Sequence, residues 1–150
     1  MHGLTKNLGT TVIYPEDRTW RAAGPLDENG KGIFVSLIYG DLETKGPVNF
    51  LMKYSAGVKA PPHTHSGDYY AVVVSGKFRH FLESENEFKE LTPRATWFQK
   101  GQVVHQDCCV GPEDCILNIF WPEGFDVHFV EDPKHPKSVA IWRSTSSPWI

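Results

Sequence analysis

The sequence contains no run of about 18 apolar residues, the length that a membrane-crossing helix requires. Its first segment, Met1 to Thr11, also lacks the charged-then-apolar pattern of a secretory signal peptide. We therefore expect a cytoplasmic protein that has no membrane partner.

Basic residues are neither abundant nor grouped. The chain has 15 Lys and Arg against 18 Asp and Glu, and a net charge of -3. Nucleic-acid-binding proteins concentrate positive charge on one face, so we expect no nucleic-acid partner.

Cysteine is scarce as well. The three thiols, at Cys108, Cys109 and Cys115, form an odd set within one short region. This pattern argues for reduced thiols rather than a disulfide framework. Core packing is the expected role of these thiols, and a redox or metal-binding role for Cys108 and Cys109 is the alternative.

Long amphipathic helices are missing too, and only residues 15–22 carry the Pro and acidic residues of a short helix start. Gly and Pro instead separate short runs rich in β-branched and aromatic residues, which is typical of strands. We predict one all-β sandwich or barrel with few short helices over residues 1–150. The expected strands are 33–39, 48–54, 69–74, 78–82, 95–99, 115–121, 127–130 and 139–142.

Two histidines, His63 and His65, end a segment that Pro61 and Pro62 hold extended. Extended backbone places both rings on one face, where two imidazoles form half of a site for Zn, Fe, Ni or Cu.

A third histidine, His105, follows a turn marked by Gly101. We expect its strand to face the other two histidines across the interior, which would complete three metal ligands. The alternative is that each ring is a polar edge residue bonded to backbone. His2, His128 and His135 have no partner at ligand spacing, so we expect them to be structural or surface residues.

The segment GVKAPPHTHSGDYYAVVVSG, residues 57–76, resembles the first sequence motif of the cupin superfamily. Tyr69 stands where that motif usually has Glu. A second, looser motif lies at about 95–109, where Cys109 stands in the place of a frequent Asn. The matching residues are Gly57, His63, His65 and Gly76 in the first motif, and Gln99, Gly101 and His105 in the second. The resemblance implies a cupin-type jelly-roll barrel.

Without the Glu, the chain resembles single-domain, ChrR-like cupins with three histidines, among them the acetylacetone-cleaving dioxygenases. A metal held by neutral rings alone keeps its double positive charge and favours an anionic, chelating substrate such as an enolate. Asp68 is the nearest acid, but a regular strand would turn it to the other face. Tyr69 is expected to line the pocket and to orient a ligand through its hydroxyl.

Other polar residues are candidates for the same site. Gln99 would accept the free N–H of a ligand histidine. Arg79 and His80 point to opposite faces of one strand, so one of them faces the interior; Arg79 would bind an anionic substrate there or otherwise lie in solvent. The expected apolar walls of the core or pocket are Phe50, Met52, Phe98 and Phe120.

The resemblance implies an oxidoreductase, a non-haem Fe(II) dioxygenase that uses molecular oxygen to cleave a carbon–carbon bond in a small dicarbonyl or related enolisable substrate. Zn or Ni in the same place would suit a non-catalytic, ligand-sensing cupin instead. Metal-free sugar-nucleotide isomerisation leaves the histidine pattern unexplained. The predicted metal ligands are His63, His65 and His105, and the predicted catalytic residues are Tyr69, Gln99 and Arg79.

We also expect a homodimer, because small jelly rolls expose edge strands that pair across a twofold axis. The apolar tail, SVAIWRSTSSPWI, would pack either on the partner or on its own barrel.

Overall fold

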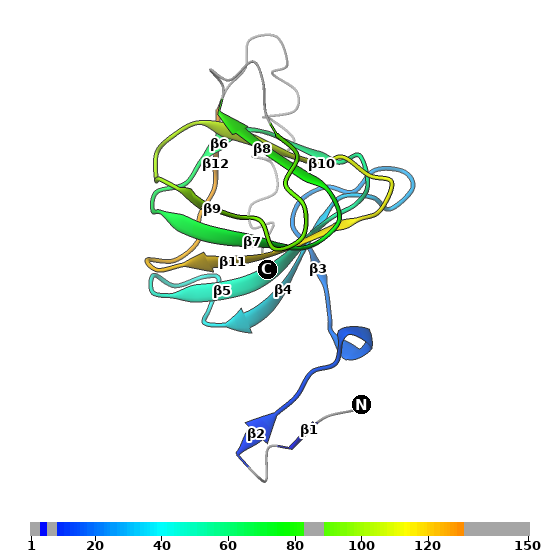
Figure 1. Ribbon diagram of the computed structural model, residues 1–150. Helices are drawn as coiled ribbons and strands as arrows, with labels where there is room; N and C mark the ends of the chain where they lie inside the picture. The colour runs from blue at the N-terminus through cyan, green and yellow to red at the C-terminus, as the bar shows by residue number, and fades with distance from the viewer. Residues whose placement is uncertain (1–3, 6–8, 83–88, 131–150) are drawn as a thin grey trace.

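Two antiparallel sheets pack face to face in the computed structural model, which describes residues 4–5, 9–82 and 89–130 (Figure 1). One sheet has four strands in the order β12 (His128–Phe129), β6 (Lys59–Thr64), β10 (His105–Cys109) and β8 (Phe78–Leu82). The other has six, in the order β3 (Arg21–Ala22), β4 (Ile33–Tyr39), β5 (Val48–Tyr54), β11 (Cys115–Trp121), β7 (Tyr69–Ser75) and β9 (Thr96–Gln99). The all-β prediction is confirmed.

A separate hairpin of β1 (Leu4–Thr5) and β2 (Thr10–Thr11) precedes the barrel. Within the described part of the chain, no helix has the length and apolarity that crossing a bilayer requires.

Six of the expected strands form where the sequence predicts them. β4, β5, β8 and β11 have the expected bounds, and β7 and β9 differ from them by one residue. Of the expected strand 127–130 only β12 forms, and the expected strand 139–142 lies outside the described residues. The strands β6 and β10, which carry the histidines, were expected as extended segments, but no bounds were predicted for them. The prolines of β6 and the polar residues of β10 obscure the alternation of apolar and polar residues that indicates a strand.

The short helix expected at residues 15–22 is wrong. Only a 3-10 turn, η2 (Pro15–Asp17), forms there, and Arg21 and Ala22 continue as β3. Pro15 starts the turn as expected, but no residue of the turn is buried. A helix this short needs an apolar face against the core, and this segment has none.

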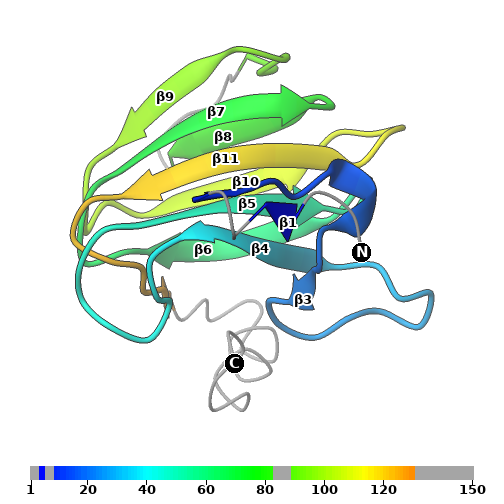
Figure 2. The same ribbon diagram turned by 90° about the horizontal axis from the view of Figure 1, so that it is seen from below.

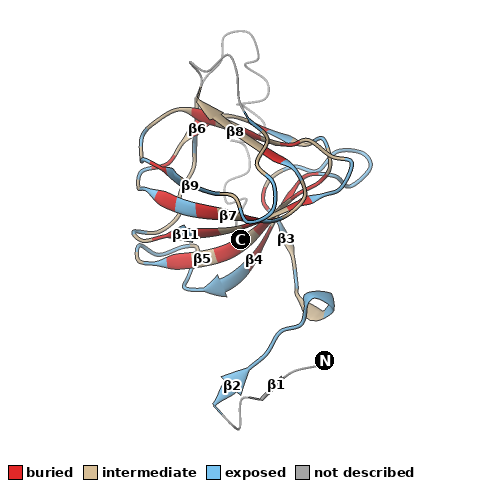
Figure 3. Cartoon of the chain, viewed as in Figure 1, coloured by how far each residue is buried: buried red, intermediate tan, exposed pale blue. Residues whose placement is uncertain are grey.

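Alternate residues of the central strands form the core, as the striped colouring of β7 in Figure 3 shows. Phe50 and Met52 of β5 point inward and are buried, as expected. Phe98 and Phe120 were expected to be walls of the core or pocket, but their side chains are 51% and 40% exposed. Each occupies an outward position of its strand, so strand parity outweighs hydrophobicity there.

The three thiols also differ in whether they face the core. Cys109 and Cys115 are fully buried in the core, and Cys108, on the other face of β10, is half-buried. The expectation of core packing therefore holds for Cys109 and Cys115.

Two glycines of the first motif differ in what a side chain would meet, and this difference yields a prediction. Gly57 and Gly76 both have positive φ, +81° and +86°. A Cβ at Gly57 meets nothing within 4 Å, whereas one at Gly76 would lie 2.6 Å from Asp114 O and 2.9 Å from Cys115 Cα.

We expect Gly57→Ala to lower the free energy of unfolding by about 1–2 kcal/mol, the cost of left-handed backbone. Gly76→Ala should cost about 2–5 kcal/mol, because the steric clash adds to that strain. Urea unfolding of both variants measures the difference. Equal losses would contradict the packing described here.

Candidate metal centre

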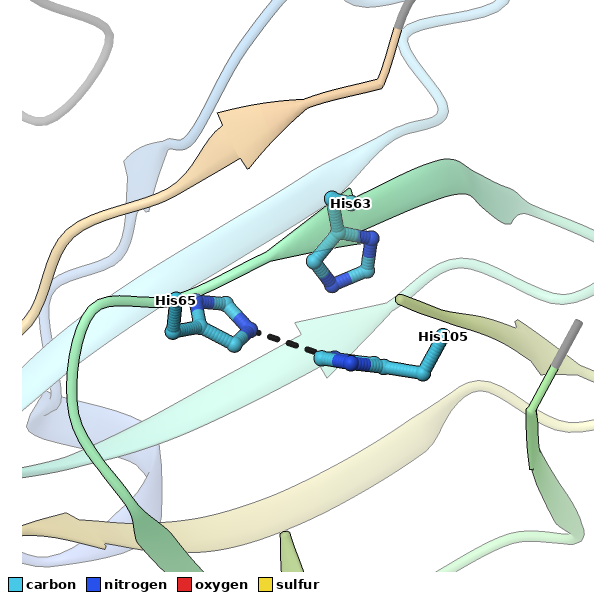
Figure 4. A group of neighbouring side chains, drawn as sticks. All are labelled: His63, His65 and His105. Carbon is cyan, nitrogen blue, oxygen red and sulfur yellow. Dashed lines mark hydrogen bonds between the residues drawn. The ribbon is translucent and has the colours of Figure 1, made fainter. Parts of the chain in front are cut away.

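The three candidate histidines converge because two strands pair in register. His63 on β6 lies directly opposite His105 on β10, and His65 follows the end of β6 (Figure 4). Residues opposite each other in an antiparallel pair have Cβ atoms about 5 Å apart. The two strands are thus hydrogen-bonded neighbours in one sheet, which corrects the expectation that they face each other across the interior.

The rings are close and buried. Ring centroids are 4.2 Å apart for His63 and His105, 4.9 Å for His63 and His65, and 5.0 Å for His65 and His105. One nitrogen from each ring lies within 4.8 Å of the other two. All three residues are at most 6% exposed.

Backbone carbonyls fix the orientation of each ring. The Nδ1 atoms of His63, His65 and His105 lie 2.7, 2.6 and 3.0 Å from the carbonyl oxygens of Pro61, Asp126 and Val103. A carbonyl oxygen only accepts, so each Nδ1 donates its proton. In the rings of His65 and His105, when neutral, this leaves the Nε2 lone pair free for a metal.

Two of these Nε2 atoms face each other. The Nε2 atoms of His65 and His105 are 3.2 Å apart, the contact dashed in Figure 4. Burial is the main cause that lowers the pKa of His65 to about 3 and that of His105 to about 4. Both rings are therefore neutral near pH 7, and neither Nε2 carries a proton to share. Two lone pairs at this distance repel each other, and a cation bound to both relieves the repulsion, so the donor set fits a metal ion.

A carboxylate adjoins the cluster, which the sequence analysis missed. Asp107 Oδ2 lies 3.3 Å from His63 Nε2 and 3.9 Å from His105 Nε2. Burial alone raises the pKa of Asp107, but its contacts with His63 and His80 outweigh burial and hold the pKa well below its usual range. The signal was present: Asp107 follows His105 by two residues on one strand, so both share a face.

His80 holds the other oxygen of this carboxylate. His80 and Asp107 are opposite each other on β8 and β10, and His80 Nδ1 lies 2.5 Å from Asp107 Oδ1. His80 Nε2 lies 2.7 Å from Gln99 Oε1, while the Gln99 amide nitrogen donates to Lys100 O. Gln99 thus accepts from His80 and not, as expected, from a ligand histidine. Of the Arg79 and His80 pair, His80 is the one beside the cluster.

The remaining sequence candidates occupy different places. Tyr69 is buried, with its ring centroid 5.4 Å from that of His65, and its hydroxyl accepts a hydrogen bond from Trp97 Nε1 at 3.1 Å. Asp68 is exposed and accepts from Gly101 N, so it serves the turn rather than the cluster. Arg79 pairs with Glu90 at 3.3 Å, and both side chains are more than one third exposed. We therefore leave Arg79 and Asp68 out of the proposed site.

A loop after β11 secures His65. Asp126, whose carbonyl receives the His65 ring proton, accepts hydrogen bonds through its carboxylate from the Ser66 backbone N–H, at 2.7 Å, and from the Ser66 hydroxyl. His128 Nε2 lies 3.1 Å from Ser66 Oγ and 3.2 Å from Asp126 Oδ2. These contacts tie the loop to the turn after β6.

A small cavity of about 40 Å³ lies beside the rings. Its walls are mainly apolar and aromatic, and His63, His65 and Asp107 supply polar groups. Among its apolar lining residues are Met52, Tyr54, Trp97, Leu117, Trp121 and Phe125. The site is thus a group of metal-type ligands at the edge of a mainly apolar pocket.

The shifted histidines predict how stability depends on pH in chelator-treated, metal-free protein. Unfolded rings take up protons below pH about 6.5, whereas native His65 and His105 remain neutral until about 3 and about 4. The unfolded state then binds more protons, so the free energy of unfolding falls as pH drops from 6.5 to 4. Each ring contributes at most about 1.4 kcal/mol per pH unit.

Urea unfolding between pH 7 and pH 4 measures this slope. His65→Gln should make it shallower, because one titrating ring is gone. A free energy of unfolding that stays constant over this range would contradict the buried, neutral state of the rings.

Comparisons with known proteins agree on the architecture. No family model matches the chain, and no curated protein matches it in sequence. Among solved structures, the polyketide cyclase RemF from Streptomyces resistomycificus matches with a TM-score of 0.67 and 14% identity, over 89% of this chain and 98% of RemF.

Two further structures match similarly. An RmlC-like cupin from Ralstonia eutropha JMP134 has a TM-score of 0.61 and 18% identity, over 87% of this chain and 78% of its own. The DMSP lyase DddQ from Ruegeria pomeroyi DSS-3 has a TM-score of 0.62 and 14% identity, over 85% of this chain and 72% of DddQ. Identities this low establish the fold alone. The chain therefore has the fold of the RmlC-like cupins.

Proposed function

We propose that the protein is a metal-dependent cupin enzyme that binds one divalent metal ion through His63, His65 and His105. The observation that carries this proposal is the 3.2 Å contact between the Nε2 atoms of His65 and His105, two rings whose Nδ1 atoms donate to backbone carbonyls. Carbonyl groups fix both rings before a metal arrives, so binding costs little reorganisation.

Within this class, the proposed reaction is Fe(II)-dependent dioxygenation that cleaves a carbon–carbon bond in a small enolisable dicarbonyl compound. Bound Fe(II) would supply Lewis acidity toward the carbonyl oxygens and electrons for O₂. Imidazole ligands carry no negative charge, so three of them would leave the positive charge of a metal in place. Because Asp107 already shares its charge with His80 through a 2.5 Å contact, an attraction for an enolate remains.

The pocket suits a reaction that must exclude water. Its walls are mainly apolar, and the Tyr69 hydroxyl and the Trp97 indole N–H bond to each other. We propose that Tyr69 packs against the substrate, because its ring lies beside that of His65. Gln99 and His80 would act by holding Asp107 in place. A dry site of this kind protects a reactive intermediate.

Two of the similar structures bear enzyme names, and one is relevant to the substrate class. RemF is named as a polyketide cyclase, and polyketide chains carry enolisable carbonyl groups. This supports an enolisable carbonyl compound as the type of substrate. The link to acetylacetone-cleaving or ChrR-like cupins rests on the sequence resemblance only.

The second candidate function is non-catalytic binding of Zn or Ni. The size of the cavity favours it: about 40 Å³ is about the space of three water molecules. A substrate must therefore be small, or side chains must move to admit it. Three histidines also suit zinc.

Oxygen uptake by Fe(II)-loaded protein with a β-dicarbonyl substrate, alongside metal titration calorimetry, tests the proposal. We expect stoichiometric metal binding and substrate-dependent oxygen consumption. His105→Ala should weaken metal binding by more than about 100-fold and abolish uptake, because one of three ligands is lost.

Gln106→Ala is the matched control, since Gln106 is next to His105 on β10 but on the opposite face. It should leave metal affinity and oxygen uptake unchanged. Zn-loaded protein should consume no oxygen. Tight metal binding without oxygen consumption across several β-dicarbonyls would contradict the dioxygenase and favour the binding function. Unchanged metal affinity in His105→Ala would contradict the site itself.

A further inference from the structure

One buried hydrogen-bond donor beside the metal centre has no partner. Trp121 is the last residue of β11, where strand alternation turns its side chain inward, and the residue is only 2% exposed. Its indole Nε1 atom is buried, yet it has no hydrogen-bond partner among the described residues. An unsatisfied buried N–H lowers stability, so native proteins pair nearly all of them. An orphaned donor in such a place indicates a site for a bound molecule.

The indole of Trp121 lies next to the candidate metal ligands. Its ring centroid is 4.6 Å from that of His65 and 4.5 Å from that of Tyr69. Trp121 also lines the cavity of about 40 Å³ to which His63 and His65 contribute. A molecule bound to a metal at these histidines would therefore lie beside the indole.

Other polar groups of the cavity already have partners. Trp97 also lines it, but the Trp97 Nε1 atom donates to the Tyr69 hydroxyl at 3.1 Å. The carboxylate of Asp107 lies 2.5 Å from the ring of His80. Trp121 therefore adds an unpaired donor to a mainly apolar pocket, and an N–H pairs with an acceptor such as a carbonyl oxygen.

Phe125 lines both the cavity and a wider groove of about 780 Å³. Residues 42–46 between β4 and β5, residues 66–67 after β6 and residues 122–126 after β11 form the groove. Figure 2 shows the loop between β4 and β5 and the loop after β11 at the same end of the barrel. The Phe125 ring is half-buried, and its centroid is 4.8 Å from that of Trp121. A ligand too large for the cavity therefore has room on the far side of Phe125, next to the indole.

The charge of the groove favours an uncharged ligand. Glu43, Glu123 and Asp126 line it together with one basic residue, Lys45. An entrance with excess negative charge repels anions and admits neutral molecules. The compound that reaches the cavity by this groove is therefore a neutral carbonyl compound.

We propose that Trp121 is a ligand-binding residue whose indole N–H donates to an oxygen atom that the metal does not hold. This inference rests on the metal centre proposed above and narrows its substrate class. Two oxygen atoms of a dicarbonyl compound are enough to chelate a metal, so the Trp121 N–H selects compounds that carry a third acceptor oxygen. Neutral β-keto esters have such an oxygen, whereas simple β-diketones do not.

Ligand binding to Zn-loaded protein, measured by calorimetry, tests the role of Trp121 without turnover. The probes are methyl acetoacetate, a β-keto ester, and acetylacetone, a β-diketone without the third oxygen. Trp121→Phe keeps an aromatic ring and removes the N–H. The dissociation constant of acetylacetone divided by that of methyl acetoacetate should be about 10-fold lower in Trp121→Phe than in the wild type, because only the ester loses a hydrogen bond.

Leu117→Val is the matched control. Leu117 also lines the cavity and is 1% exposed, but its side chain has no polar atom. This variant opens space as Trp121→Phe does, so the ratio of dissociation constants should keep its wild-type value. Circular dichroism and Zn titration should match the wild type in both variants, since neither residue is a proposed metal ligand.

NMR spectroscopy of the Zn-loaded wild type tests the same contact without any variant. A new hydrogen bond to oxygen deshields an indole N–H proton. The Trp121 indole proton should therefore move downfield when methyl acetoacetate is added, and much less when acetylacetone is added.

An unchanged ratio in Trp121→Phe, with both probes bound, would overturn the role of Trp121 and leave the metal centre intact. A Trp121 indole proton that does not respond to the ester would also overturn it, because the N–H would then be bonded to water alone. Zn-loaded protein that binds neither probe would overturn the substrate class. Wild-type protein that binds no Zn would refute the metal centre, and this inference with it.

Discussion

The site depends on the hydrogen bonds that hold three imidazole rings by their Nδ1 atoms. Each ring of His63, His65 and His105 donates to a backbone carbonyl at 2.6–3.0 Å, so its position follows from the course of the main chain. Burial keeps the rings of His65 and His105 neutral. The Nε2 lone pairs of these two neutral rings lie 3.2 Å apart, an arrangement that suits a bound cation.

The pairing of three strands brings these side chains together. β6 and β10 pair so that His63 and His105 are directly opposite, and β8 pairs with the other side of β10 so that His80 meets Asp107. The inner face of the six-stranded sheet supplies apolar walls for the pocket. The outer face of the same sheet exposes aromatic side chains.

Much of the fold could be predicted from the sequence because strand alternation is a local signal. β5 and β11 alternate over their whole length, and their bounds follow from the pattern. The helix start at Pro15 was misleading, because a local signal for a first turn says nothing of whether an apolar face follows. The expectation that Phe98 and Phe120 are walls of the core or pocket was wrong for a different reason. Hydrophobicity does not tell which side of a sheet a residue occupies when both sides carry apolar residues.

The candidate site could also be predicted only in part. That His63 and His65 share a face follows from extended backbone, and the same rule would have found Asp107 two residues after His105. The contact of His80 with Asp107 depends on which strands pair and in what register, which one sequence does not contain. Gln99 was expected to contact a ligand histidine. Its partner is instead His80, which lies on a different strand, so the sequence alone did not show this contact.

The most direct test of the central claim is the metal content of the full-length protein purified without oxygen or chelators. Elemental mass spectrometry should find a divalent metal, Fe above Zn or Ni, in a stoichiometric amount with the chain. Protein that is metal-free as purified, and that stays metal-free when Fe(II), Zn(II) and Ni(II) are offered in turn, would contradict the account, because the paired lone pairs of His65 and His105 would then have no cation to satisfy them.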